Sequence, residues 1–313
     1  MTSMAESAKV QRDASVVIPV LNAARYLPAL LEAFRTQKPA PPREVILVDS
    51  HSTDDTRDMA ATRAGVRIVP IGQFSHGRAR NLGAREAGGD IVVLMTQDAL
   101  PRDDHWLAKL LEPFADGQVA AVFSRQLPRA DAHPMERFFL ETHFPPGPPV
   151  RRQKKPGAPL TFPDVFFSNV SAAVRRDVLL RHPFDETLIM SEDQQFARDI
   201  LNAGYATLYQ PESVVYHSHA YTLREVFKRY FDSVHSLTVI FPKHGLGSSA
   251  SIGVPYLMRE MRHMVVRHPR RIPYYFLYTV AKTAGTVMGH FAPVLPRFLL
   301  RRLSLHSYHW KGP

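Results

Sequence analysis

Cysteine is absent from the sequence, which excludes disulfides, thiolate zinc sites, iron–sulfur clusters and cysteine nucleophiles. Long apolar runs are also missing. A membrane-spanning helix needs about 20 apolar residues, but the most apolar late stretch, 272–300, is interrupted by Lys282, His290, Arg297 and three prolines. We interpret that stretch as an interfacial or buried helix. Residues 1–13 lack the apolar core of a secretory signal, and we expect them to be flexible.

Acidic residues are scarce in the last third of the chain. Residues 220–313 carry 14 Lys and Arg against 3 Asp and Glu, a balance of 14 − 3 = +11, whereas residues 1–219 carry 25 against 26, or −1. A basic block of this kind binds polyanions, either nucleic acid or an anionic membrane surface. The 45% of hydrophobic residues is typical of a globular chain with a sizeable core.

Short β-branched runs alternate with helical patterns over the first 125 residues. We predict strands at 15–20, 44–48, 66–69, 91–95 and 119–123, and helices at 26–34, 54–64, 77–88 and 104–114. This alternation indicates βαβ units, and therefore an α/β protein with a Rossmann-like, mainly parallel sheet and flanking helices. No glycine-rich loop follows the first strand, which disfavours a P-loop and the usual dinucleotide-binding fold.

The second half of the chain has a different pattern. Residues 144–162 are rich in proline and contain four basic residues, so we predict a mobile loop. A helix is expected at 192–203 with Ser191 as its N-cap, followed by strands at 205–209 and 214–217. From residue 222 onward the pattern is helical, basic and aromatic.

Polar side chains follow three of the predicted strands. Asn22 comes just after the first strand, where it can also cap the next helix, Asp49 ends the second, and Gln97 and Asp98 follow the fourth. Ligands of open parallel sheets bind beyond the carboxyl ends of the strands. We therefore expect the carboxylates of Asp49 and Asp98 to face one cleft, although Asp49 on its own is also a common turn-capping residue.

Several of these motifs together resemble a known family. The segments VVIPVLNAARYL, VDSHSTDDT and HGRARNLGAREAGGDIVVLMTQDALP resemble the nucleotide-sugar half of a family 2 glycosyltransferase with the GT-A fold, and SEDQQFARDIL resembles its acceptor-side motif. TQDALP and the tail LPRFLLRRLSLHSYHW are similar to bacterial rhamnosyltransferases of surface-polysaccharide (O-antigen) synthesis. The resemblance covers about residues 14–310. It implies an inverting transfer of a sugar, L-rhamnose from dTDP-L-rhamnose, to a saccharide or lipid-linked saccharide.

The resemblance also implies a division of the chain. A GT-A catalytic domain would span 14–221, with a nucleotide-sugar-binding half at 14–125 and an acceptor-side half at 126–221. The basic helical region would then be 222–313. An anionic membrane surface suits this region because the acceptor in such pathways is often lipid-linked, so we expect a cytoplasmic enzyme attached peripherally to the inner face of the cell membrane, without nucleic acid as a partner. A homodimer through the C-terminal helices is the alternative.

Site roles follow from the same resemblance. In the donor pocket, Asp49 would accept from the ring N–H of the pyrimidine. The other donor-binding positions would be Pro19, Asn22, Arg80, Asn81, Gln97 and Asp98. Asp193 would be the catalytic base that takes the proton of the acceptor hydroxyl. The alternative for Asp193 is a purely structural role, as an acid on the first turn of a helix that the helix dipole stabilises. We expect the neighbouring Glu192 to support the base without contacting the substrate.

Asp98 would also hold a divalent cation, Mg²⁺ or Mn²⁺, that neutralises the leaving diphosphate. His217 is a candidate second ligand of the cation. Residues i and i+2 of a strand point to the same face, so His219 would lie close to His217 and support it from outside the ligand shell. The alternative is that both are surface histidines without a ligand. The sequence departs from the family at its acidic motifs. Thr96 replaces the first acid of Asp-x-Asp, and Ser50-His51 replaces Asp-Gly, so the expected metal site has one clear carboxylate, Asp98.

Two other functions fit part of the pattern. A sugar nucleotidyltransferase also uses a parallel sheet and a cation. That class requires a glycine-rich basic loop after the first strand, and residues 20–25 do not contain one, which disfavours this function. A non-enzymatic polyanion-binding protein would use the basic tail, but the near-neutral first two-thirds and the carboxylates at its strand ends argue against it.

Overall fold

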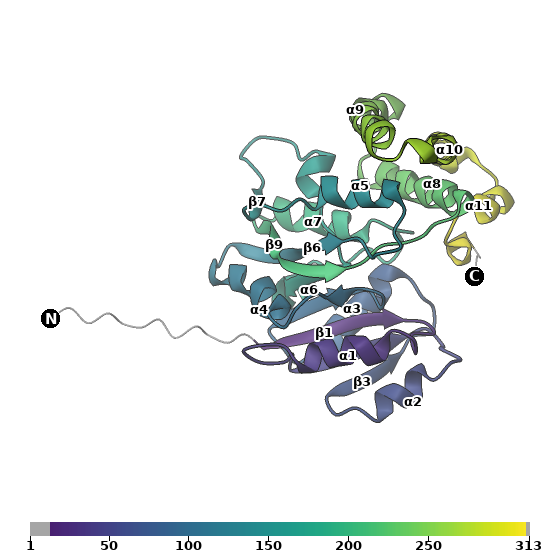
Figure 1. Ribbon diagram of the computed structural model, residues 1–313. Coiled ribbons are helices and arrows are strands. Elements are labelled where there is room, and N and C mark those ends of the chain that lie inside the picture. Colours follow the sequence, from purple (N-terminus) through teal and green to yellow (C-terminus); the bar gives the residue numbers. More distant parts are fainter. Residues whose placement is uncertain (1–12, 311–313) are drawn as a thin grey trace.

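The computed structural model describes residues 13–310, and the predicted flexible segment 1–13 therefore lies outside it apart from Asp13. One sheet organises the described residues (Figure 1). Its strands are β1 (Ala14–Val20), β2 (Glu44–Asp49), β3 (Val66–Pro70), β4 (Ile91–Met95), β5 (Leu100–Pro101), β6 (Val119–Leu127), β7 (Val150–Gln153), β8 (Ser171–Arg175) and β9 (Ala206–Tyr216). They run in the order β3-β2-β1-β4-β8-β6-β9-β5, and β7 pairs with β9.

The sheet is mainly parallel where the site lies. β3, β2, β1 and β4 are parallel neighbours, so their carboxyl ends share one edge. β8 is antiparallel to both β4 and β6, whereas β9 is parallel to β6. The α/β class, the Rossmann-like parallel core and the flanking helices predicted from the sequence are confirmed.

Helices cover both faces of the sheet. They are α1 (Leu27–Arg35), α2 (Thr56–Ala61), α3 (His76–Glu86), α4 (Trp106–Leu111), α5 (Pro134–His143), α6 (Arg176–Arg181) and α7 (Glu192–Asn202). Alternate residues of β1 divide between two cores: Val16 and Ile18 pack with α1 and α4, and Val17 packs with α3, α6 and α7. Buried strands with alternating contacts to both faces are typical of a three-layer α/β domain.

Gly83 brings α3 against β1. A Cβ built at this glycine would lie 2.1 Å from the Cγ1 of Val17, so a larger residue would push the helix away from the sheet. The close approach fixes the position of the residues that α3 carries toward the carboxyl edge of the strands.

Two local predictions for the second half were wrong. The segment 144–162 is not one mobile loop, because β7 lies inside it and pairs antiparallel with β9. The exposed Arg151 suits a sheet edge, where a charged side chain can remain in solvent. The two strands predicted at 205–209 and 214–217 form the single strand β9, in which a register shift opposite Ser124 and Arg125 accommodates Pro211.

The C-terminal region is helical, as predicted. It contains α8 (Leu223–Ile240), α9 (Leu246–Arg267), α10 (Ile272–His290) and α11 (Arg297–Leu303). Gly285 and Gly289 bring α10 against α8: a Cβ at either position would lie 2.3 Å from the carbonyl oxygen of Phe227 or 2.7 Å from that of Phe231. None of the helices described in residues 13–310 is long and apolar enough to cross a bilayer.

Candidate active site

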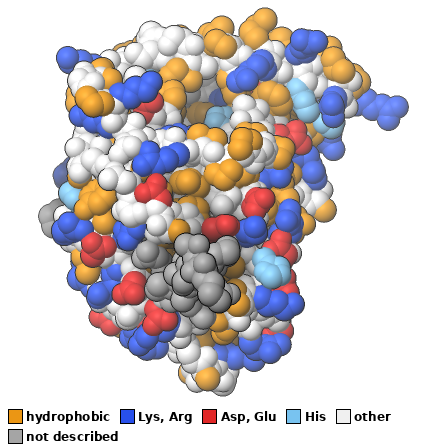
Figure 2. Space-filling model, turned by 90° about the vertical axis from the view of Figure 1, so that its left-hand side faces the viewer, with side chains coloured by type: hydrophobic (Ala, Val, Ile, Leu, Met, Phe, Trp, Pro, Cys, Tyr) orange, Lys and Arg blue, Asp and Glu red, His pale blue; other side chains and the backbone are white. Residues whose placement is uncertain are grey.

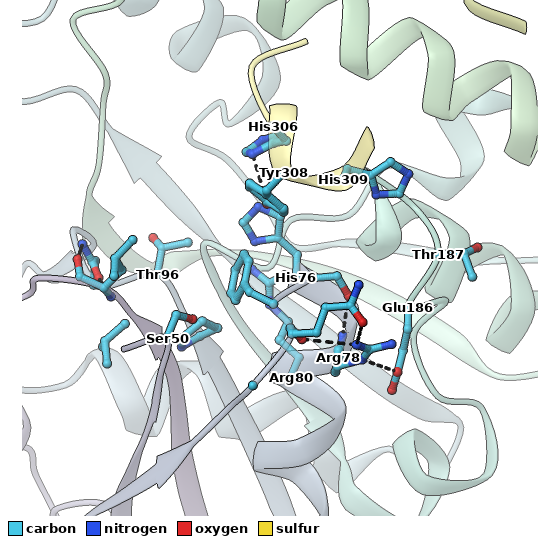
Figure 3. Close-up of a pocket in the computed structure, with 18 residues that line it drawn as sticks. Ser50, His76, Arg78, Arg80, Thr96, Glu186, Thr187, His306, Tyr308 and His309 are labelled. Atoms are coloured by element: carbon cyan, nitrogen blue, oxygen red, sulfur yellow. Dashed lines mark hydrogen bonds and ion pairs between the residues drawn. The ribbon is translucent and has the colours of Figure 1, made fainter. Parts of the chain in front are cut away.

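A cavity of about 820 Å³ lies at the carboxyl edge of the parallel strands. Figure 3 shows residues from the strand ends, from α3 and from the segment after α11 around it. Three residues predicted to bind a donor are on its wall: Pro19 at the end of β1, Arg80 on α3 and Gln97 after β4. The wall also includes Ser50, Phe74, Ser75, His76, Arg78, Thr96, Glu186, His306, Tyr308 and His309.

Asp49 lies directly behind this wall, next to Ser50. It is completely buried, and its oxygens accept hydrogen bonds from the backbone N–H of Ser52 (3.1 Å) and from Nε of Arg57 (2.7 Å). Burial on its own would raise the pKa of Asp49, but the hydrogen bonds from Ser52 and Arg57 outweigh it and hold this pKa below the usual value. Asp49 is therefore an ionised carboxylate. Its Oδ1 caps the turn after β2 by accepting from the backbone N–H of Ser52.

Asn22 and Gln97 tie the loops of the cavity together. The Asn22 side-chain oxygen accepts from the backbone N–H of Thr53 (2.8 Å), and the amide of Gln97 bonds both to N–H and C=O of Leu21 (2.9 and 3.2 Å). The prediction that Asn22 caps the following helix was wrong, because α1 begins later, after Tyr26. Its polar side chain joins the β1 and β2 loops instead.

Three residues with side chains adopt left-handed backbone angles among the described residues, and all three border the site. They are Asn22 (φ 52°), His51 (φ 64°) and Ser191 (φ 63°). His51 stands where the resembled family has glycine, so the loop keeps a conformation that favours glycine even though a larger residue occupies it. Such strain is common at functional sites.

A buried ion pair joins α3 to α7. Arg80 Nη1 contacts the carboxylate of Glu192, and both side chains are almost fully buried. Burial would raise the pKa of Glu192, but the charge of Arg80 outweighs it and keeps this pKa low. Because Arg80 lines the cavity and Glu192 immediately precedes Asp193, the pair connects the cavity wall to the predicted base.

Asn81, the neighbour of Arg80, points elsewhere. Its Nδ2 donates to the carbonyl of Phe184 (2.9 Å) and to Glu186 (3.1 Å), and its Oδ1 accepts from the N–H of Phe184 (3.0 Å). The predicted contact of Asn81 with a nucleotide therefore gains no support from this arrangement. Asn81 instead fixes the loop that brings Glu186 to the cavity.

Asp193 lies on the first turn of α7. Its oxygens accept from the backbone N–H of Asn169 (3.3 Å) and Gln194 (2.9 Å). Burial, followed by the neighbouring Glu192 charge, raises the pKa of Asp193 to about 7. A carboxylate with this pKa is suited to general base catalysis near neutral pH. Ser191 was predicted to cap α7 through its side chain, but its left-handed backbone prevents this, and no capping bond from it occurs in the described structure.

Asp98 forms a cluster with His217 and His219 beside the strand ends. His217 Nε2 and His219 Nδ1 each lie 3.7 Å from a carboxylate oxygen of Asp98, and the ligand atoms of the three side chains lie within 4.8 Å of one another. Burial lowers the pKa of His217 to about 3 and that of His219 to about 4, so both imidazoles are neutral. Neutral imidazoles and carboxylates are common metal ligands in proteins, and the separation of these three ligand atoms leaves room for one ion between them.

The tautomer of His217 follows from its partners. Its Nδ1 lies 3.0 Å from Oε1 of Gln126, whose Nε2 donates to Ser168 (3.0 Å). The network therefore assigns the proton to Nδ1 and leaves the lone pair of Nε2 facing Asp98. Second-shell bonds of this kind orient the imidazoles that bind metals.

Sequence reasoning missed one wall of the cavity. His76 opens α3, and the rings of Phe74 and Tyr308 (centroids 5.8 Å apart) and of His76 and His306 (5.3 Å) meet edge to face. The segment LSLHSYHW was singled out only for its resemblance to rhamnosyltransferases. The two histidines and the tyrosine of this segment are the signal that could have pointed to a binding site.

Comparison with known proteins agrees with the geometry. The sequence model described as Glycosyl transferase family 2 matches residues 15–182. The O-antigen chain rhamnosyltransferases RfbN of Salmonella typhimurium and WbaN of Salmonella anatum are each 33% identical to this chain over 95% of its length and 96% of theirs. The chain belongs to glycosyltransferase family 2. The family predicted from the motifs is confirmed, and the protein is a glycosyltransferase.

Solved structures share the fold of this glycosyltransferase. The mannosyltransferase PcManGT of Pyrobaculum calidifontis, in complex with GDP-Man and Mn²⁺, has a TM-score of 0.62 at 19% identity and covers 91% of this chain and 88% of its own. TarS of Staphylococcus aureus with UDP-GlcNAc has a TM-score of 0.52 at 15% identity, with 94% and 84% coverage. The GT-A fold class is therefore confirmed.

Proposed function

We propose that this glycosyltransferase transfers L-rhamnose from dTDP-L-rhamnose to a saccharide or lipid-linked saccharide, with inversion at the anomeric carbon. One observation carries the mechanism: Asp98 and Asp193 do not line the cavity themselves, but each is the chain neighbour of a residue that lines it or pairs with its wall. Gln97 on the wall directly precedes Asp98 of the carboxylate–imidazole cluster, and Arg80 on the wall pairs with Glu192, which precedes Asp193. The two related O-antigen rhamnosyltransferases support rhamnose as the sugar.

Each residue has a defined task in this single displacement. Asp193 accepts the proton of the acceptor hydroxyl while that oxygen forms a bond to the anomeric carbon, and the bond from this carbon to the donor diphosphate breaks. The nucleoside lies toward Pro19, Ser50 and the buried Asp49 at the ends of β1 and β2. Attack from the face opposite the leaving group inverts the configuration.

Asp98, His217 and His219 are the residues that would hold a divalent cation. The cation supplies positive charge that stabilises the leaving diphosphate. Of the two ions that the sequence suggested, Mn²⁺ suits a site with two nitrogen ligands better than Mg²⁺, which prefers oxygen ligands throughout. Mn²⁺ accompanies the donor in the PcManGT structure, which supports this choice.

The C-terminal helices would place the enzyme on the cytoplasmic face of the membrane. Large apolar side chains are exposed on α9 and α10, among them Met258, Val266, Phe276, Leu277 and Val280. Exposed arginines lie in the same region, namely Arg262, Arg267, Arg270 and Arg271, and Figure 2 shows basic and apolar side chains next to each other toward the top of the molecule, the level at which α9 lies in Figure 1. Apolar residues within a basic surface fit an anionic lipid interface, where a lipid-linked acceptor would be presented. The homodimer remains the competing use of this face.

Product analysis with a panel of nucleotide sugars tests the function. We expect transfer from dTDP-L-rhamnose with Mn²⁺ and a bacterial membrane extract as the acceptor source, and much less from UDP-glucose, UDP-GlcNAc or GDP-mannose. Asp98→Asn and Asp193→Asn should each lower transfer by about 100-fold or more, while Asp55→Asn, at an exposed acid at the start of α2, should not. Preferred transfer from another donor would overturn the rhamnose assignment, and near-wild-type activity in Asp193→Asn would overturn the assignment of the base.

A further inference from the structure

The segment after α11 folds back from the helical region onto the donor cavity. It contains the short 3₁₀ helix η5 (Ser307–Trp310), and Figure 3 shows its side chains above His76. His306, Tyr308 and His309 all line the cavity, although they lie more than 200 residues from the strand ends that form its floor. This wall is supplied by the C-terminal region and not by the 15–182 segment that matches the family model.

A buried carboxylate holds the segment in place. Asp232 on α8 is completely buried, and its Oδ2 accepts from the backbone N–H groups of Leu305 (2.9 Å) and His306 (3.1 Å). Lys228, one turn earlier, donates to the carbonyl of the buried Ser304 (3.0 Å). Oδ2 of this buried carboxylate accepts from two consecutive backbone N–H groups, which indicates a built attachment, because a buried carboxylate is costly unless it is hydrogen-bonded.

The segment meets the cavity on the side that His76 and Arg80 line. His306 packs against His76, which lies one helical turn before Arg80 on α3, and Arg80 pairs with Glu192 beside Asp193. Burial lowers the pKa of His306 to about 3, and the nearby carboxylate of Glu192 works against that shift. The imidazole is therefore neutral, so it can donate and accept hydrogen bonds without a net charge.

From these contacts we infer that His306 and Tyr308 bind the sugar of the nucleotide-sugar donor, and that Asp232 positions them. The inference rests on the proposed function, because the anomeric carbon must lie near Asp193 for the base to act. The sugar then occupies the part of the cavity beside Arg80, His76 and His306, and the nucleoside occupies the part beside Pro19 and Ser50. Neutral imidazole and phenol groups suit an uncharged hexose: they bond its hydroxyl groups, and the ring faces pack on its C–H groups.

Binding measurements with and without the sugar test the inference. Calorimetric titration should show that His306→Ala weakens dTDP-L-rhamnose binding about tenfold, the equivalent of one or two hydrogen bonds, while dTDP binding changes less than about twofold. Tyr308→Phe should cause a smaller loss of the same kind, since only the hydroxyl is removed. Ser307→Ala, an exposed residue between the two, is the matched control and should match the wild type with both ligands.

Asp232 is tested as a positioning residue. Asp232→Ala should reproduce the selective loss of nucleotide-sugar affinity, and Asp232→Asn, which keeps an oxygen to accept the two N–H groups, should restore it. If Asp232→Ala does not fold, the His306 and Tyr308 variants still decide the matter. Equal loss of dTDP and dTDP-L-rhamnose binding, or no loss of either, would overturn the sugar assignment. Wild-type protein that binds neither ligand would instead refute the proposed function.

Discussion

Gln126 on β6 accepts a hydrogen bond from Nδ1 of His217, 91 residues later in the chain, at 3.0 Å. Because Ser168 engages the amide nitrogen of Gln126, the glutamine oxygen is held toward the imidazole. His217 must then present its other nitrogen to Asp98. The hydrogen bond thus sets both the tautomer and the direction of a proposed metal ligand.

Replacing Gln126 should weaken metal binding without touching a ligand. For Gln126→Leu we expect the Mn²⁺ concentration that gives half-maximal transfer to rise about 10- to 100-fold, with a near-normal rate at saturating Mn²⁺. Gln118→Leu, an exposed glutamine just before β6, is the control and should leave the Mn²⁺ requirement unchanged. An unchanged requirement in Gln126→Leu would show that the tautomer does not depend on this bond.

The pH dependence of transfer should report Asp193. A base works only when deprotonated, and burial raises the pKa of Asp193 to about 7. The kcat/KM should therefore fall as the pH drops below about 7 and level off above it. Asp193→Asn should lower kcat by about 10²–10⁴-fold while dTDP binding stays intact. A rate that is flat from pH 5 to 8 would rule out Asp193 as the base.

The ion pair of Arg80 and Glu192 should matter for stability as well as for the site. Glu192→Gln leaves the guanidinium of Arg80 buried without its counter-charge, which costs about 3–5 kcal/mol and should lower Tm clearly in a thermal melt. Glu32→Gln, which breaks the exposed pair with Arg35, is the control and should leave Tm unchanged. A similar Tm for both variants would mean that solvent reaches Arg80 in solution.

Attachment to anionic vesicles should depend on the C-terminal helices. The protein should float with vesicles that contain phosphatidylglycerol at low salt, and added salt should release it. The exposed Arg270 and Arg271 sit between α9 and α10, and Gln at each position should weaken attachment by about 1 kcal/mol, or roughly fivefold. Arg181→Gln, an exposed arginine on α6, is the control. Failure to float, together with a dimer in sedimentation, would assign this face to self-association.

The sequence predicted the parallel half of the fold well because its signals are local. Each strand from β1 to β4 is a short run rich in β-branched residues, and polar residues stand at or just after the ends of β1, β2 and β4, which share one edge of the parallel sheet. The cluster of Asp98 and His217 was expected from the motif and from the alternation of residues along a strand, and the structure brings the two together with His219.

Other features depend on contacts that the sequence does not reveal. Arg80 was expected to face the nucleotide, but its partner Glu192 lies 112 positions away, so the ion pair could not be read from either motif. The strand β7 was missed because its arginines are typical of a loop and its pairing with β9 is supplied by tertiary structure. The same reason hid the wall formed by His306 and Tyr308, which reaches the cavity only because α8 holds the chain end in place.

The close contact of α10 with α8 has a mechanical consequence. At Gly285 and Gly289 the backbone of α10 lies against the carbonyl groups and Cβ atoms of α8, so the two helices have little room to move relative to each other. α10 carries the exposed Phe276 and Leu277, and α8 carries Asp232, which holds His306 over the cavity. Under the proposed membrane attachment, a tilt of α10 would be transmitted through α8 to the segment that Asp232 holds over the cavity.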